Sequence, residues 1–247
     1  MKSWTAYASP VVAALGITLA LVGVGLASAG VLPPLAGFGL FALGILGGSL
    51  FGIVLGIIGL LRTRGDSGRA GAGRAGMGVV LGLLMIGFLM IVRPDSVPPI
   101  HDVTTSPDDP PSFVFAATVP DNAERDLTYP HGPADSAAQQ RAAYADLAPI
   151  ELSQPPSEAL GAARAAAEEL GWEIVDEAAP TETSDGRLEA TFTSRSFRFV
   201  DDIVVRLRAN PATGGTTVDL RSTSRVGQSD LGANAARIRA FAEKLGA

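Results

Sequence analysis

The strongest constraint on this chain is a run of 59 residues without a charge, from Ser3 to Leu61. A membrane-spanning helix needs only about 20 apolar residues, and Pro33-Pro34 divides the run into two. A third apolar run follows an arginine-rich loop. Backbone groups in lipid must be hydrogen-bonded within the segment. The sequence therefore predicts a membrane region, residues 1–93, with three transmembrane helices over residues 11–32, 35–61 and 75–92.

The distribution of arginine predicts the orientation of these helices. Four arginines lie in the loop 62–74, whereas the loop near 31–34 has no charge. Loops rich in arginine and lysine stay in the cytoplasm. We therefore expect a multi-pass protein of the bacterial cytoplasmic (inner) membrane, with the N-terminus inside and everything after residue 92 on the extracytoplasmic side.

A signal peptide is an alternative interpretation of the first helix. Lys2, an apolar run and Ala27-Ser28-Ala29 have the arrangement of a secretory leader with a small-residue cleavage site. Cleavage after Ala29 would leave two spans. The predicted side of the soluble part is the same in either case.

Small residues follow one face of the second span, where Gly44, Gly48, Gly52 and Gly56 recur every four residues. Such a stripe lets helix backbones approach closely. It favours packing of the three spans against one another, and homo-oligomerisation through the stripe is the alternative. The spans contain no ionisable residue, so we do not expect an ion-coupled transporter.

The soluble part is acidic and begins with an irregular connector. Residues 1–94 carry six basic residues and one acidic residue, whereas the remainder carries 13 basic and 24 acidic. Residues 94–133 are rich in proline and aspartate, which prevents regular helix. Ile100, Phe113 and Phe115 are apolar residues that a free tether does not need. We expect residues 100–105 to pack against the C-terminal sheet or the final helix.

Residues 134–247 have the pattern of an α+β domain. Helices are expected over 136–144, from a cap at Ser153 to residue 170, and from Ser229 or Asp230 to residue 245. Strands are expected over 150–152, 172–178, 187–199, 203–208 and 216–225, with a bulge or bend near 194–196. Consecutive strands joined by short turns pair antiparallel. The predicted fold is therefore N-terminal transmembrane helices followed by a two-layer domain, an antiparallel sheet with helices on one face.

Period-two alternation gathers arginines on one face of this sheet. They could bind an anionic ligand through paired N–H donors, or they could form cross-strand pairs such as Arg206 with Asp219 or Glu189, which is the favoured interpretation. The densest polar segment is 221–237, where a strand ends and a helix begins. A helix start can bind an anion, although a serine or aspartate there commonly caps it. The candidate binding residues are His101, Asp102, Arg195, Arg221, Ser224, Arg225, Ser229, Asp230 and Asn234.

Catalytic chemistry has little support in the sequence. HExxH, CxxC, P-loop and GxSxG patterns do not occur, and there is no cysteine. The near-neutral bases are His101 and His131. Asp108-Asp109 and Asp201-Asp202 are interpreted as solvated turns in preference to cation sites. We expect no catalytic residue, metal, cofactor or nucleic acid.

Two functions remain open. The favoured one is a non-enzymatic envelope protein whose domain binds a protein partner, an anionic lipid or a glycan. The alternative is a hydrolase that uses His101 with a serine of the 222–229 segment.

Several motifs occur in order along the soluble part: Ile100-His101-Asp102-Val103-Thr104-Thr105, Pro107-Asp108-Asp109-Pro110-Pro111, Tyr129-Pro130, Gly171-Trp172-Glu173-Ile174-Val175, Asp201-Asp202 and the 221–237 segment. Together they resemble the family named domain of unknown function 1499, from about Pro99 to the C-terminus. The resemblance implies a bacterial envelope setting with preceding membrane spans and no established activity. It also implies that the 101–105 segment belongs to the same folded unit as the C-terminal strands.

Overall fold

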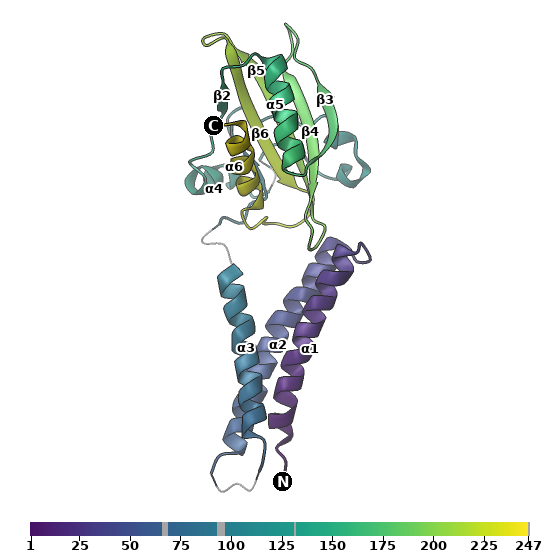
Figure 1. Ribbon diagram of the computed structural model, residues 1–247, viewed down its shortest axis with the longest axis vertical. Coiled ribbons are helices and arrows are strands. Elements are labelled where there is room, and N and C mark those ends of the chain that lie inside the picture. The colour runs from purple at the N-terminus through teal and green to yellow at the C-terminus, as the bar shows by residue number, and fades with distance from the viewer. Residues whose placement is uncertain (66–68, 93–96, 131, 247) are drawn as a thin grey trace. The chain divides into compact units, whose positions relative to one another are not determined.

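The computed structural model describes residues 1–65, 69–92, 97–130 and 132–246 (Figure 1). The chain separates into a helical unit and a sheet unit, and each is described by itself. The predicted boundary at residues 93 and 94 lies outside the described residues, as do the C-terminal Ala247 and the candidate base His131.

The helical unit contains, among the described residues, three helices that are long and apolar enough to cross a membrane. They are α1 (Trp4–Ser28), α2 (Pro34–Arg62) and α3 (Ala72–Val92). The helix α1 begins before the predicted residue 11 because its polar first turns are buried, and the Ser9 hydroxyl donates to the Gly52 carbonyl at 2.9 Å. It ends before the predicted residue 32, close to Gly30, whose φ is +72°. The chain is therefore a membrane protein.

The glycine stripe of α2 packs within the chain. A Cβ on Gly44 would lie 2.4 Å from the Gly16 carbonyl oxygen, and one on Gly52 would lie 3.0 Å from Ala13. Gly56 similarly faces α3. These contacts agree with the favoured interpretation of the stripe, and a homo-oligomer stays a prediction.

In the described part of the chain, the sheet unit contains six antiparallel strands, five of which follow the order β1-β6-β5-β4-β3. The short strand β2 pairs with another part of β6. The strands are β1 (Asp102–Thr104), β2 (Ile150–Leu152), β3 (Glu173–Ala178), β4 (Gly186–Thr193), β5 (Val200–Asn210) and β6 (Gly215–Ser224).

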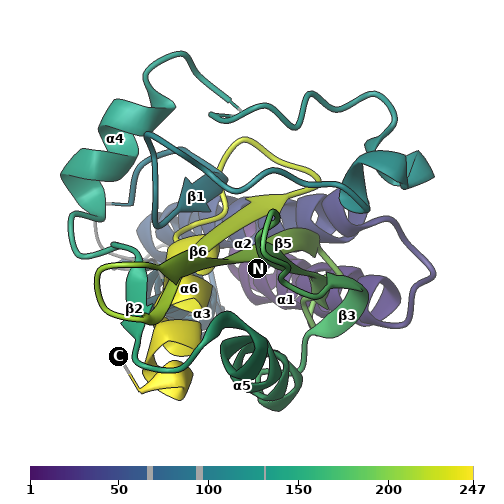
Figure 2. The ribbon, with the colours of Figure 1, turned by 90° about the horizontal axis from the view of Figure 1, so that it is seen from above.

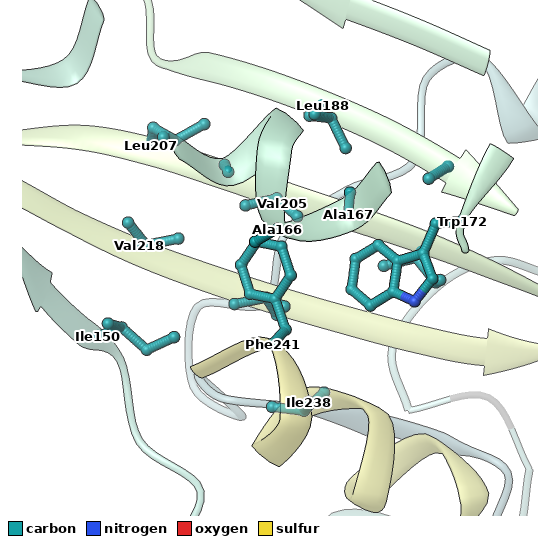
Figure 3. Packing of buried hydrophobic residues seen from close by; sticks show 14 of the residues in the cluster. Ile150, Ala166, Ala167, Trp172, Leu188, Val205, Leu207, Val218, Ile238 and Phe241 are labelled. Carbon is teal, nitrogen blue, oxygen red and sulfur yellow. The ribbon is translucent and has the colours of Figure 1, made fainter. Parts of the chain in front are cut away.

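Helices α5 (Pro156–Glu169) and α6 (Ala233–Leu245) cover one face of the sheet (Figure 2). The main core lies between them and the sheet, where Trp172 stacks on Phe241 with ring centroids 5.0 Å apart (Figure 3). Three further helical segments precede α5: η1 (Ala116–Thr118), η2 (Pro120–Asn122) and α4 (Ser136–Ala143). The predicted fold class, apolar N-terminal helices followed by an α+β domain of antiparallel sheet with helices, is confirmed.

Three predicted element limits are wrong. The strand expected over 187–199 ends at Thr193, because residues 194–199 reverse the chain, with two hydrogen bonds between Ser194 and Phe199. The final helix begins at Ala233, because Leu231 and Gly232 have positive φ. Helix α5 begins after Pro155, whose ring fixes φ, and Ser153 does not cap it.

We predict that Gly44→Ala weakens the helix bundle, because the new methyl would meet the backbone of α1. Overpacking of this kind costs about 1–3 kcal/mol. Gly39→Ala is the matched control, since nothing lies within 4 Å of a Cβ at Gly39. Thermal unfolding of the full chain in detergent would measure the difference. Equal melting temperatures for the two variants would contradict the packing described here.

Candidate functional site

The outer face of the sheet, opposite α5 and α6, is polar and buried. Alternation along β4, β5 and β6 places Glu189, Asp202 and Arg221 on this face, and each of the three is at most 2% exposed. Residues 97–130, here called the strap, include the sheet strand β1 and lie over this face from Asp109 onward. Val204 provides a small apolar contact for Phe113, Ala116 and Leu127 of the strap. The strap therefore acts as a third layer, and the polar side chains beneath it require partners.

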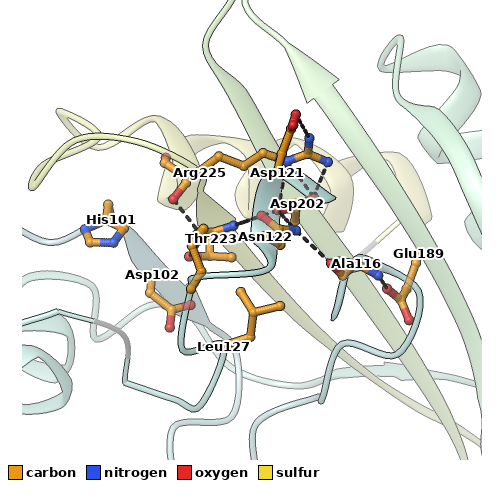
Figure 4. Close-up of polar contacts among 12 residues, drawn as sticks. His101, Asp102, Ala116, Asp121, Asn122, Leu127, Glu189, Asp202, Thr223 and Arg225 are labelled. Atoms are coloured by element: carbon orange, nitrogen blue, oxygen red, sulfur yellow. Dashed lines mark hydrogen bonds and ion pairs between the residues drawn. The ribbon is translucent and has the colours of Figure 1, made fainter. Parts of the chain in front are cut away.

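Glu189 binds the backbone of the strap. Its Oε1 accepts hydrogen bonds from the N–H groups of Val114 and Phe115 at 2.7 and 2.9 Å, and its Oε2 accepts one from Ala116 at 2.9 Å. Arg187 lies 3.1 Å from the same carboxylate. A single buried side chain of β4 thus fixes the start of η1 (Figure 4).

Asp202 is the centre of a second contact between the strap and the sheet. It accepts hydrogen bonds from Asn122 and Arg125 of the strap, both at 3.0 Å, and from Arg225 at 2.8 Å (Figure 4). Burial lowers the pKa of Arg225, but the hydrogen bonds and charge of Asp202 outweigh it, so that this pKa is raised. The Arg225 Nη1 also reaches the exposed Asp121 at 3.1 Å.

Arg221 and Asp102 form a buried ion pair between β6 and β1. The guanidinium donates from Nε and Nη2 to the two carboxylate oxygens at 2.9 and 2.8 Å, and both side chains are at most 2% exposed. The rings of Phe113 and Tyr129 lie 5.0 and 5.4 Å from the guanidinium carbon. Removing either partner would leave the other charge buried without a counter-charge, which strongly destabilises a fold.

Gln140 of α4 completes the edge of β1. Its amide accepts from the Thr104 N–H at 3.0 Å and donates to the Thr104 carbonyl at 2.7 Å. The Tyr129 hydroxyl donates to the same amide oxygen at 3.1 Å. Burial, followed by the charge of Asp102, raises the pKa of Tyr129 to about 12. This phenol therefore stays protonated and remains a donor at neutral pH.

A third contact uses an exposed carboxylate of the strap. Asp109 accepts hydrogen bonds from Arg206 and Arg208 at 2.8 and 2.7 Å, and the Arg206 bond lowers the pKa of Asp109. Both arginines also bind the fully buried Asp219. The predicted cross-strand pair of Arg206 with Asp219 is confirmed.

Asn234 joins α6 to the first strand of the domain. Its Oδ1 accepts from the Ser222 hydroxyl at 2.6 Å, and its Nδ2 donates to the His101 carbonyl at 2.9 Å and to the Ser224 hydroxyl at 3.1 Å. The backbone N–H of Asp230 donates to the Ile100 carbonyl. The prediction that residues 100–105 pack against the C-terminal sheet and helix is confirmed.

The candidate serines have structural partners. Ser222 bonds to Asn234 and accepts from Arg237, Ser224 bonds to Asn234, and Ser229 accepts from the Leu231 N–H. None of these partners can act as a general base. His101 is adjacent to Asp102, and both carboxylate oxygens of Asp102 accept hydrogen bonds from Arg221. The contacts of the described residues therefore give no support to a triad.

The remaining predicted residues lie in two loops. Asp230 accepts from the N–H groups of Gly232 and Asn234, and burial raises its pKa. Arg195 is exposed in the β4–β5 turn, separate from the network around Asn234. The structure thus brings together Asp102 with Arg221, and His101 and Ser224 with Asn234.

Two hollows open beside the strap. The larger, here called the edge hollow, has a volume of about 520 Å³ and lies between the strap and strands β3, β4 and β5. Its lining includes Phe115, Val119, Val175, Thr191, Val200 and Arg225. A second hollow, of about 470 Å³, lies over Arg221 and is lined by Phe113, Leu127 and Tyr129. Sites that bind small ligands have such volumes and a mostly apolar lining with a few polar groups, which describes the edge hollow, whereas the second hollow is lined mainly by polar surface.

The family model described as a protein of unknown function, DUF1499, matches residues 102–245. The chain belongs to the DUF1499 family. The match begins at β1 and ends in the last turn of α6, so the DUF1499 domain includes most of the strap and the network around Asn234. No curated protein and no solved structure matches the chain.

Sequence reasoning missed several residues that hold the DUF1499 domain together. Alternation along β4 puts Glu189 on the polar face, but its backbone partners cannot be read from the sequence. Asn122, Arg125 and Gln140 were not singled out. The available signal was compositional, because residues 95–185 contain 18 acidic and 3 basic residues, whereas residues 186–247 contain 6 acidic and 10 basic. Ion pairs between the two segments, such as Asp102 with Arg221 and Asp109 with Arg206, bring these opposite charges together.

We predict that Arg221→Met lowers the free energy of unfolding by about 3–5 kcal/mol, because it leaves Asp102 buried without a counter-charge. The double variant with Asp102→Leu should lose less than Arg221→Met alone. Denaturant unfolding of the full chain in detergent, followed by fluorescence of the buried Trp172, would measure both.

Arg239→Met is the matched control for that experiment. Arg239 forms a similar two-bond pair with Asp146, but both side chains are about half exposed. Exposed pairs contribute about 0–1 kcal/mol. A loss for Arg221→Met no larger than that for Arg239→Met would show that the buried pair does not hold β1 in place.

Proposed function

We propose that this chain is a multi-pass protein of the bacterial cytoplasmic membrane and that its DUF1499 domain is a periplasmic binding module of the cell envelope. The membrane placement is supported by the loop between α2 and α3, which contains four arginines, and by the uncharged loop between α1 and α2. Near the arginine loop, Arg62 lies 6.0 Å from the ring of Trp4 and Arg74 lies 4.0 Å from the ring of Tyr7. Arginine beside tryptophan and tyrosine is typical of a membrane interface.

The orientation is testable with enzyme fusions. Alkaline phosphatase fused after Ala247 should be active, because it folds only outside the cytoplasm, and the same enzyme fused after Arg69 should be inactive. Whole-cell phosphatase activity, normalised to the amount of fusion protein, would measure the difference. The reverse pattern would overturn the orientation.

The edge hollow is the observation that carries the binding function. The buried charges near it are already paired, and Ser222, Ser224 and Ser229 have structural partners, so the contacts support a surface for recognition. Its mostly apolar lining and the hydroxyl groups of Thr191 and Thr193 suit a ligand that combines an apolar part with a polar group, whereas the Arg225 guanidinium is already bound by Asp202 and Asp121. A segment of an envelope protein, an anionic lipid or a glycan can supply both.

Photo-crosslinking in native membranes tests this function. A benzophenone amino acid at Val119, on the rim of the edge hollow, should give a discrete adduct that mass spectrometry can identify. The same residue at Ala212, in the β5–β6 turn, is the control. Thr191→Trp should abolish the adduct, because the indole would occupy the hollow. An adduct that also forms at Ala212, or that persists in Thr191→Trp, would contradict a ligand in the edge hollow.

A further inference from the structure

One end of the sheet contains both the entry of the chain into the domain and two loops. Asp102 pairs with Thr223, and Ser224 pairs with Asp201. The entry segment 97–101, the β4–β5 turn 194–199 and the loop 225–232 therefore lie at the same end of the antiparallel sheet. The β5–β6 turn lies at the opposite end, because β5 runs between the two turns.

The composition of this entry end differs from that of the rest of the domain. Arg195 and Arg198 are exposed in the β4–β5 turn on either side of Ser196-Phe197, and no acidic residue occurs from 190 to 200. In the neighbouring loop, Val226 is 38% exposed and Leu231 is 57% exposed. The acid of that loop, Asp230, is directed at the backbone N–H groups of Gly232 and Asn234. We call the set Arg195, Arg198, Val226 and Leu231 the entry-end rim.

The chain itself keeps a bilayer within reach of this rim. Helix α3 ends at Val92, and Val97 already contacts the domain near Gly232. The five peptide steps between Val92 and Val97 can span at most about 18 Å. A membrane that contains α3 is therefore available to the entry end of the domain.

We propose that the entry-end rim binds the anionic lipid headgroups of the membrane in which the three helices are anchored. Guanidinium groups form paired hydrogen bonds with phosphate, and exposed aliphatic side chains such as Val226 and Leu231 can enter the boundary between headgroups and acyl chains. A basic and apolar rim is otherwise unexpected on a part of the chain with 13 basic and 24 acidic residues. The inference rests on the membrane anchoring of the proposed function and is independent of the edge hollow.

Site-directed spin labelling tests the proposal, and the absence of cysteine lets one label be placed at a time. The full chain carries the label at Ser196→Cys in the β4–β5 turn, or at Ala212→Cys in the β5–β6 turn as the matched control. The protein is placed in nanodiscs of phosphatidylcholine with or without phosphatidylglycerol. Collision rates with oxygen and with a water-soluble nickel chelate then report the environment of each label.

With phosphatidylglycerol present, we expect the label at residue 196 to be protected from the nickel chelate and the label at residue 212 to remain accessible. Arg195 is replaced with Gln, and Arg198 with Asn, which tolerates positive φ. For each arginine lost, the ratio of membrane-bound turns to turns exposed to water, as reported by the label at residue 196, should fall about fivefold. Equal accessibility at 196 and 212 would overturn the proposal. Protection that is the same in both lipid mixtures would also overturn it, because charge would then not be recognised.

This outcome can be separated from that of the proposed function. The Arg195 and Arg198 substitutions lie outside the edge hollow, so crosslinking from Val119 should be unchanged in that variant. Loss of lipid protection with intact crosslinking would support the rim as the lipid-binding surface. Absence of crosslinking in the unsubstituted chain, with lipid protection at residue 196, would remove the hollow as a site and leave the rim proposal standing.

Discussion

The hydrogen bonds of Glu189 to three consecutive backbone N–H groups of the strap are the contact on which the outer layer depends. A sheet of this kind has an apolar face, covered by α5 and α6, and a polar face that water could solvate. Here the polar face is buried instead, so each of its charges must find a partner within the protein. The strap provides those partners from a segment that is 75 residues away in sequence from Glu189.

This arrangement also explains why the strap has the composition of a flexible linker without behaving as one. Its prolines limit the conformations of the unfolded chain, so less entropy is lost when the segment is fixed. Several of its aspartates accept hydrogen bonds from arginines of the sheet region, as Asp109 does from Arg206 and Arg208. Asp102 goes further, because its partner Arg221 is buried with it. Removing one member of such a pair costs about 3–5 kcal/mol, because the other charge stays buried without a partner, so the pair holds β1 to β6 only while both residues are present.

The sequence was informative wherever a periodic pattern met a local rule. Apolar runs predicted the membrane helices, alternation predicted the polar face, and the apolar residues of the connector predicted that it packs against the domain. The sequence failed where long-range pairing or backbone conformation decides. Asp102 and Arg221 are 119 positions apart in the sequence, which leaves no local sign of their pairing. The β4–β5 turn was interpreted as a bend within one strand, since the alternation changes there and neither glycine nor proline marks the reversal.

That turn also contains one of two non-glycine residues at positive φ among the described residues, Arg198 and Leu231, both at the entry end of the domain. A left-handed conformation costs an ordinary residue about 1–2 kcal/mol, and glycine or asparagine would avoid most of it. A sequence shaped by stability alone would therefore place those residues in both loops, as it does at Gly214 and Gly227. Strain of this kind persists where the side chain is needed and the surrounding structure can bear it. The strongly bonded strap and sheet can bear it, and the side chains retained are a guanidinium and an exposed isobutyl group, the two chemistries that a lipid surface recognises.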